Sequence, residues 1–143
     1  MKIITNSASE TKNFAFCFAS KLKKGDILCF FGDLGSGKTT FIQGLAKGFK
    51  IRDDITSPTF VFLNIYKGCH FPLYHFDLYR VKNTDEIRGL GYEEFFYGEG
   101  VSVVEWSEKL KELLPKKYTE IRIKFLGRDK REISINTERK NTD

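Results

Sequence analysis

The sequence has little of what defines several common classes of protein. No apolar run approaches the roughly 20 residues of a membrane-spanning helix, and the N-terminus has no signal-peptide core. Its three cysteines, Cys17, Cys29 and Cys69, are odd in number and show no metal-site spacing. There is no internal repeat and no low-complexity segment. These absences predict a cytoplasmic protein without a membrane segment, whose cysteines are reduced, buried thiols.

The composition is typical of one globular domain. The chain has 143 residues, of which 41% are hydrophobic and 30% charged, so it is long enough to bury a core. Its 24 basic and 19 acidic residues leave a net charge of +5. The basic residues are scattered, which favours a solvated surface over an acidic or RNA-bearing partner. We expect one domain over residues 1–136 and a frayed tail at 137–143.

One glycine-rich stretch predicts phosphate binding. Residues 32–40 match the P-loop pattern G-x-x-x-x-G-K-[ST], between a strand-like apolar run at 27–31 and helical spacing at 41–49. Its glycines let backbone N–H groups turn toward an anion. Lys38 can reach the β- and γ-phosphates, and the Thr39 hydroxyl can hold Mg²⁺. The predicted nucleotide-binding residues here are Gly32, Asp33, Leu34, Gly35, Ser36, Gly37, Lys38, Thr39 and Thr40.

The remaining chain mixes helix and strand patterns. Two capping boxes, at Ser7 and Asn83, predict helix starts, and Ser107 is expected to cap a further helix that runs to Leu114. Two pairs of strand-like runs predict hairpins, with turns near residues 67–70 and 127–130. We therefore expect an α/β fold, a three-layer P-loop NTPase domain whose mixed sheet is parallel around the P-loop and antiparallel at its edges.

Two carboxylates follow apolar strand-like runs. Asp77 ends the run 71–77, and Glu105 ends the run 101–105. Ligands collect at the carboxyl edge of such a sheet, and a P-loop uses a carboxylate near its Mg²⁺. We expect at least one of the two acids to serve the metal and the other to position the attacking water. An ordinary polar strand end is the alternative for either.

Three further residues near these motifs allow two interpretations each. Thr59, after a Ser-Pro pair, resembles a switch residue that binds Mg²⁺ or senses the γ-phosphate, although a plain loop has the same pattern. His75 is interpreted as a packed core histidine rather than a catalyst. Trp106 belongs either to the core or to a cover over the site.

The nucleotide-binding class stays open on motifs alone. The chain lacks the N-K-x-D segment of Ras-type GTPases and the signature stretch of ABC ATPases. A small-molecule kinase needs an arginine-rich lid and an acceptor segment, for which there is little room. It nevertheless remains an alternative, as does a nucleotide-binding scaffold that never hydrolyses.

In combination, the motifs resemble the bacterial TsaE (YjeE) family. The P-loop, Ser-Pro-Thr-Phe at 57–60, Tyr-His-Phe-Asp-Leu-Tyr-Arg at 74–80 and Val-Glu-Trp at 104–106 come in the family's order, and the likeness runs from about residue 5 to 135. It implies a weak ATPase that uses ATP and Mg²⁺ and is required for threonylcarbamoyladenosine in tRNA. Such proteins act with a TsaB–TsaD complex, and contact with tRNA is expected to be only indirect.

The resemblance also implies roles for individual residues. Lys38 and the loop amides would hold the phosphates, Thr39 and Glu105 would hold Mg²⁺, and Asp77 and Thr59 would belong to switch-like segments. The expected catalytic residues are thus Lys38, Thr59, Asp77 and Glu105. Two isolated residues, Thr11 and Arg131, match positions near the adenine.

Overall fold

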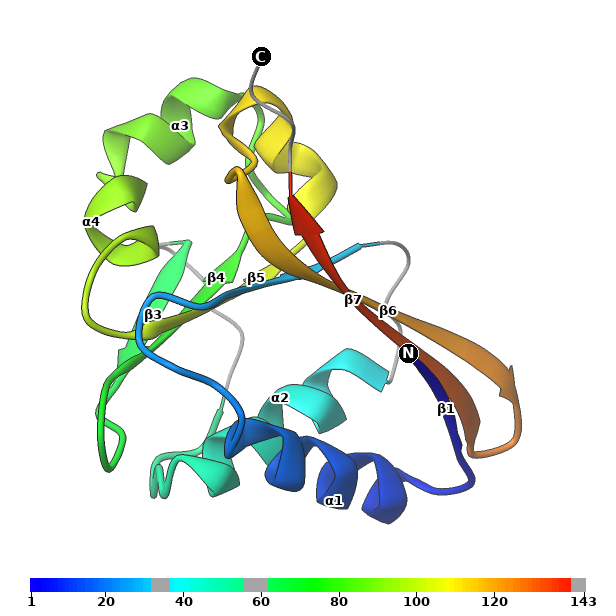
Figure 1. Ribbon diagram of the computed structural model, residues 1–143. Coiled ribbons are helices and arrows are strands. Elements are labelled where there is room, and N and C mark those ends of the chain that lie inside the picture. Colours follow the sequence, from blue (N-terminus) through cyan, green and yellow to red (C-terminus); the bar gives the residue numbers. More distant parts are fainter. Residues whose placement is uncertain (32–36, 56–61, 140–143) are drawn as a thin grey trace.

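A seven-stranded mixed sheet forms the middle of the molecule in this computed structural model, which describes residues 1–31, 37–55 and 62–139 (Figure 1). The strand order is β1-β7-β6-β2-β5-β4-β3. The strands β6, β2, β5 and β4 are mutually parallel, whereas β1, β7 and β3 pair antiparallel with their neighbours. This confirms the predicted mixed sheet. The bounds are β1 Lys2–Thr5, β2 Ile27–Phe30, β3 Leu63–Tyr66, β4 Leu73–Asp77, β5 Val101–Glu105, β6 Lys117–Gly127 and β7 Lys130–Arg139.

Helices cover both faces of the sheet, so the three-layer prediction is also confirmed (Figure 1). One face packs against α1 (Ala8–Ala19) and α2 (Gly37–Gly48), with a core that includes Phe30, Phe41 and Leu45. The other face packs against α3 (Thr84–Gly89), α4 (Tyr92–Phe96) and the 3₁₀-helix η1 (Ser107–Leu113). Phe76, Phe96 and Leu110 belong to that second core. A residue's place along a strand therefore decides which helices it faces.

Glycines let α1 and α2 pack closely. A Cβ at Gly44 would overlap the Lys12 carbonyl oxygen, and one at Gly48 would overlap the Cβ of Ala19. The two glycines lie four residues apart and therefore face the same side of α2. Because α2 begins within the predicted P-loop motif, this packing fixes the position of the helix start relative to α1.

The helix starts agree with the sequence at two of three places. The Ser7 side chain accepts a hydrogen bond from the Glu10 N–H at 3.1 Å, and that of Asn83 accepts one from the Glu86 N–H at 3.2 Å. Ser107 is not a cap, because Trp106 occupies that position and the Ser107 hydroxyl donates to the Val104 carbonyl at 2.9 Å. The segment is also 3₁₀ rather than α-helical and ends at Leu113.

Two other predictions were wrong. Residues 137–139 of the expected tail are still strand, since β7 continues to Arg139 beside the early residues of β6, and residues 140–143 lie outside the described residues. The prediction of buried cysteines is right only for Cys29, whereas Cys17 and Cys69 are exposed. Burial raises the pKa of the Cys29 thiol to about 12. Among the described residues, no helix is long and apolar enough to cross a membrane.

Candidate nucleotide and metal site

Asp77 and Glu105 lie side by side at the carboxyl edge of the sheet. They are the last residues of the parallel neighbours β4 and β5, and the strand register pairs their Cα atoms. On the other side of β5, Cys29 of β2 pairs with Val104. The strand that leads into residues 32–36 therefore ends next to Glu105. The sequence predicted this common edge for both acids, and the register confirms it.

Glu105 is buried and bonded to a histidine from the next strand. Its side chain is 6% exposed and that of His75 is 3% exposed, and Glu105 Oε2 lies 2.6 Å from His75 Nε2. His75 precedes Asp77 by two residues and pairs in register with Val103, two before Glu105. All four side chains thus belong to the same face of the sheet. The interpretation of His75 as a buried core residue is confirmed, but it missed this bond, because the bond depends on the pairing of β4 with β5, which neither run shows on its own.

The bond to Glu105 also assigns the histidine tautomer. A carboxylate oxygen accepts, so Nε2 carries the hydrogen and donates it. His75 Nδ1 is buried and has no hydrogen-bond partner among the described residues. A proton on Nδ1 would bury a second N–H without a partner, at a cost of about 1–3 kcal/mol. The bond therefore places the hydrogen on Nε2, and the Glu105 carboxylate that accepts it keeps further acceptor capacity.

Asp77 has a more open setting. Its side chain is partly exposed, and Oδ1 accepts a hydrogen bond from the Tyr79 N–H at 3.0 Å. Its own N–H donates to the Phe62 carbonyl at 2.9 Å. The chain then leaves the sheet, and Tyr79 and Arg80 are exposed. Asp77 is thus the first residue of a surface turn as well as the last residue of a strand.

An aromatic contact joins the chain beyond Asp77 to the chain beyond Glu105. The rings of Tyr79 and Trp106 lie 5.1 Å apart, and Lys109 Nζ donates to the carbonyls of Tyr79 and Val81. Trp106 has a left-handed backbone, with φ of 60°, which is uncommon for a bulky residue. It is partly buried against the second core, as one interpretation expected, and its ring also contacts that of Tyr79; a role as a cover over the site stays a prediction.

The start of α2 contributes the remaining described residues of the P-loop motif. Gly37 and Lys38 open the helix, Thr39 is exposed, and Thr40 is partly buried. The predicted helix after the P-loop is confirmed. The P-loop residues Gly32, Asp33, Leu34, Gly35 and Ser36, the Lys38 side chain and Thr59 lie outside the described residues.

The available donors fit Mg²⁺ bound together with a phosphate. Thr39 and Glu105 offer hard oxygen atoms, the ligands that Mg²⁺ prefers. Within residues 1–31, 37–55 and 62–139, no three His, Cys, Asp or Glu side chains form a metal cluster. Mg²⁺ is commonly held by one or two carboxylates with waters and substrate phosphates, rather than by a full protein cage. The chemistry of these two side chains is therefore suited to a metal site that is completed by a nucleotide.

The two residues expected near the adenine meet through Thr5. Thr11 is fully buried, and its hydroxyl lies 2.6 Å from that of Thr5. Thr5 pairs with Arg131 across β1 and β7. Arg131 is 5% exposed, its Nη1 donates to the Asp129 carbonyl at 2.6 Å, and its guanidinium lies 5.7 Å from the Phe125 ring centre. The structure brings Thr11 and Arg131 to one place, while their contact with adenine stays a prediction.

Comparison with protein families gives a match over most of the chain. The family described as "Threonylcarbamoyl adenosine biosynthesis protein TsaE" matches residues 5–133. Three curated relatives carry the name tRNA threonylcarbamoyladenosine biosynthesis protein TsaE. That from Rickettsia typhi is 46% identical over 93% of this chain and 92% of its own length. That from Bacillus subtilis is 44% identical (94% and 84%), and that from Treponema pallidum is 36% identical (94% and 99%).

A solved structure shares the fold. The crystal structure of Bacillus subtilis YdiB superposes with a TM-score of 0.77 at 40% sequence identity. The match covers 96% of this chain and 84% of the YdiB chain. Sequence and fold therefore point to the same group of proteins over nearly the whole chain.

Proposed function

The chain belongs to the TsaE family, and we propose that it acts in threonylcarbamoyladenosine modification of tRNA as a weak, Mg²⁺-dependent ATPase. Its relatives are named for that modification. The observation that carries the ATPase assignment is the registered pair Asp77 and Glu105, beside the strand that leads into the P-loop motif.

In this proposal, the residues before and at the start of α2 bind ATP. The amides of residues 32–37 and the Lys38 ammonium hold the phosphates, and the N-terminal end of α2 adds positive potential. Thr39 and Glu105 hold the metal, and His75 fixes the orientation of the Glu105 carboxylate. The bound ion would neutralise negative charge that develops on the phosphate oxygens.

Asp77 positions the attacking water and couples hydrolysis to the surface. Its Oδ1 is bonded to the Tyr79 N–H, so a shift of the carboxylate also shifts the turn that carries the exposed residues Tyr79 and Arg80. We propose that Thr59, in a second switch-like segment, senses the γ-phosphate. A TsaB–TsaD-like complex would read the state of these segments, and hydrolysis would reset that complex between turnovers.

A kinase would use the same P-loop chemistry, but no contact among the described residues favours it. The two functions differ in product, because a kinase passes the phosphate to a small acceptor. Incubation of labelled ATP with a metabolite extract is expected to give inorganic phosphate. A stoichiometric phosphorylated metabolite would instead establish the kinase.

The decisive experiment is reconstitution of tRNA modification with a TsaB–TsaD complex, this protein, ATP and Mg²⁺. Modified adenosine should form with the native chain and should depend on ATP hydrolysis. Lys38→Ala removes a charge-assisted phosphate contact and should weaken ATP–Mg²⁺ binding by about 10- to 150-fold, from roughly 1.5–3 kcal/mol. Equal affinity of both proteins in calorimetry would overturn the P-loop assignment.

A further inference from the structure

A second candidate site lies at the edge of the sheet opposite Asp77 and Glu105. A groove of about 660 Å³ is lined by the residues that precede and begin β2 and β6, by Thr137 near the end of β7, and by Tyr97 after α4. β2 and β6 are parallel, so their first residues mark the amino edge of the sheet. Thr119 and Thr137 pair across β6 and β7 and form part of the wall. The groove is therefore separate from the carboxyl edge.

The charge of the groove is strongly positive. Four lysines line it, Lys23, Lys24, Lys116 and Lys117, against Asp26 as the one acid in this lining as described. The Asp26 carboxylate accepts a hydrogen bond from the Lys23 backbone N–H at 2.8 Å. Lys24 also pairs with Glu99 at 3.0 Å, but both side chains are exposed, and such pairs are weak and screened by salt. The cations come from two segments far apart in sequence, which the fold brings to one groove.

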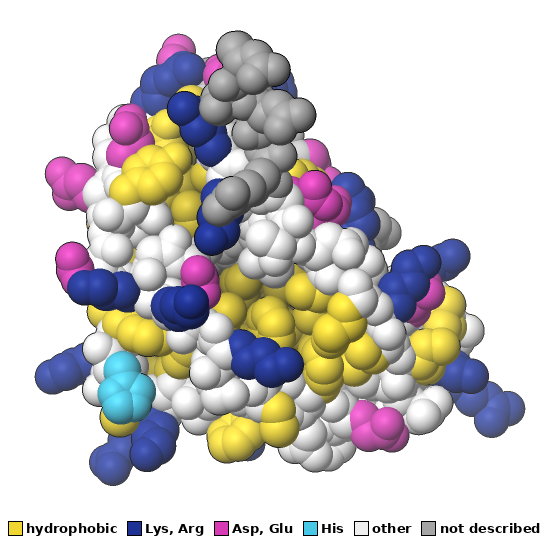
Figure 2. Space-filling model, in the orientation of Figure 1, with side chains coloured by type: hydrophobic (Ala, Val, Ile, Leu, Met, Phe, Trp, Pro, Cys, Tyr) yellow, Lys and Arg dark blue, Asp and Glu magenta, His cyan; other side chains and the backbone are white. Residues whose placement is uncertain are grey.

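Aromatic side chains stand beside these cations. Tyr97 is 63% exposed, and Tyr118 is partly buried with its ring 6.3 Å from that of Phe31. Partial desolvation raises the pKa of both tyrosines, and their hydroxyls can donate a hydrogen bond to an anion. On the face of the molecule that Figure 2 presents, Lys and Arg side chains lie around exposed hydrophobic side chains.

We propose that this groove binds a short single-stranded segment of RNA. Its lysines contact phosphates, and the exposed ring of Tyr97 stacks on a base. A cationic groove that follows the backbone, with aromatic rings for the bases, is the usual chemistry of single-strand recognition. The volume falls within the range of about 300–1,000 Å³ that is typical of ligand sites. An acidic peptide would use the lysines but has no need of an accessible aromatic ring.

This inference goes beyond the proposed ATPase function. The resemblance to TsaE proteins predicts only indirect contact with tRNA, whereas the groove gives this chain its own RNA-binding surface. Because the groove and the acids lie at opposite edges of the sheet, the two functions can be tested separately.

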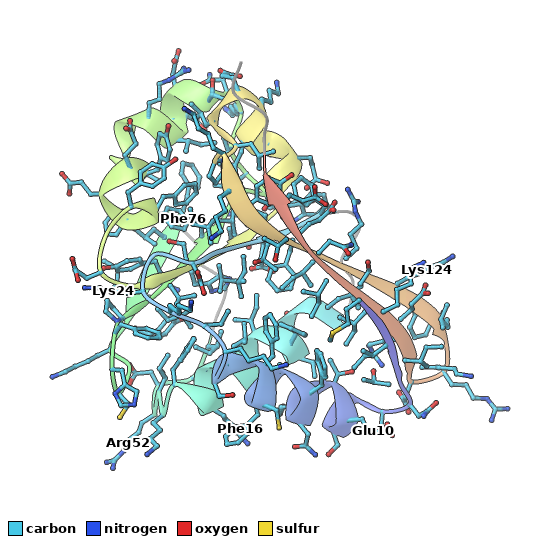
Figure 3. All side chains as sticks on the ribbon, viewed as in Figure 1. Glu10, Phe16, Lys24, Arg52, Phe76 and Lys124 are labelled. Atoms are coloured by element: carbon cyan, nitrogen blue, oxygen red, sulfur yellow. The ribbon has the colours of Figure 1, made fainter. Side chains whose placement is uncertain are left out.

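The test is binding of a fluorescent single-stranded RNA ten-mer, measured by anisotropy over a range of salt concentrations. Lys116→Gln combined with Lys117→Gln should lower affinity about 5- to 10-fold near 0.1 M salt and reduce the log–log salt slope by about 1.4, for two lost phosphate contacts. Lys124→Gln combined with Lys130→Gln is the matched control, since both residues are exposed and the charge change is equal. Lys24 and Lys124 lie on opposite sides of the molecule in Figure 3. The control should change affinity less than about twofold.

A second arm tests the base contact. Tyr97→Ser should weaken RNA binding about fivefold or more and leave the binding of a polyphosphate of equal charge unchanged. If the two lysine double variants lose RNA affinity equally, the loss comes from the net charge of the protein and not from the groove, and the proposal is overturned. Binding of an acidic peptide as tight as RNA, with no effect of Tyr97→Ser, would assign the groove to a protein partner instead. If the RNA does not bind while ATP hydrolysis persists, the groove proposal fails and the ATPase proposal stands.

Discussion

The ends of β4 and β5 carry a carboxylate in the same row of the sheet, and the two carboxylates have opposite surroundings. Glu105 at the end of β5 is buried and is bonded to His75 at 2.6 Å. Asp77 at the end of β4 is partly exposed, and its Oδ1 accepts a hydrogen bond from the backbone N–H of Tyr79 in the turn that follows. Because Asp77 and Glu105 are paired at the ends of neighbouring strands, the difference in their surroundings comes from what each side chain contacts.

This difference corresponds to two functions in the proposed mechanism. A buried carboxylate must be paired or hydrogen-bonded, because desolvation of an isolated charge is expensive. The partner that meets this need also removes freedom of movement, which suits a metal ligand. Asp77 keeps contact with solvent and with an exposed turn, and segments with few buried contacts open at low free-energy cost. Glu105 is therefore suited to hold a metal ion, and Asp77 is suited to move together with the turn that follows it.

The largest effect is expected from Glu105→Gln. The amide keeps an acceptor for His75 and nearly the same volume, so the fold should persist, while the negative charge toward the metal is lost. Hydrolysis should fall at least about 100-fold, and ATP binding should lose most of its Mg²⁺ dependence. Magnesium titrations of nucleotide affinity would measure this. An unchanged magnesium midpoint would show that Glu105 is not the metal ligand.

Asp77→Asn should separate hydrolysis from binding. The amide oxygen still accepts from the Tyr79 N–H, so the turn keeps its geometry. ATP–Mg²⁺ affinity should stay within about twofold, whereas hydrolysis should fall by about 100-fold, because the group that orients the water has lost its charge. Support of tRNA modification should fall with it. If Asp77→Asn abolishes magnesium-dependent binding and Glu105→Gln does not, the two roles are reversed.

A pair of variants at His75 tests why the two acids differ. His75→Leu leaves Glu105 buried without its donor, which should cost about 1–3 kcal/mol of the free energy of unfolding and lower metal affinity about 10-fold. His75→Gln restores a donor and should recover part of both losses. Thermal melts and magnesium titrations would compare the two variants. Equal metal affinity in both would mean that His75 serves packing alone.

The sequence predicted which residues lie at the edge of the sheet better than it predicted the contacts that these residues make. Apolar runs that end in an acid identify Asp77 and Glu105, because strand ends follow from local pattern. The bond between His75 and Glu105 depends on which strands are neighbours, and β4 and β5 are separated by two helices in the chain. The register between β4 and β5 cannot be read from the residue pattern of either strand alone. The resemblance to a family supplied the roles, but it contained nothing about burial.

The same distinction explains the errors. Serine is a common N-cap residue, which is why Ser107 was predicted to cap the helix. The chain turns one residue earlier, at Trp106, which comes directly after β5 and has a left-handed backbone. Residues 137–139 are polar and resemble a tail, yet β6 begins early enough to pair with them. The second case is decided by a partner elsewhere in the fold, the first residues of β6. Local propensity is a weak guide where tertiary contacts compete with it.

The smallest expected effect concerns the contact between the two strand ends. Trp106 is the sole tryptophan of the chain, and its ring lies 5.1 Å from that of Tyr79. If the turn after Asp77 moves with the γ-phosphate, the emission of Trp106 should differ between a non-hydrolysable ATP analogue and ADP. Tyr79→Leu removes a ring contact worth about 0.5–1.5 kcal/mol, so it should abolish most of that difference while nucleotide affinity stays within about twofold. Tyr97→Leu, an exposed tyrosine outside the carboxyl edge, is the control and should keep the native response. A difference that survives Tyr79→Leu in full would show that Trp106 reports on Glu105 alone, and that the turn beyond Asp77 does not move with the nucleotide.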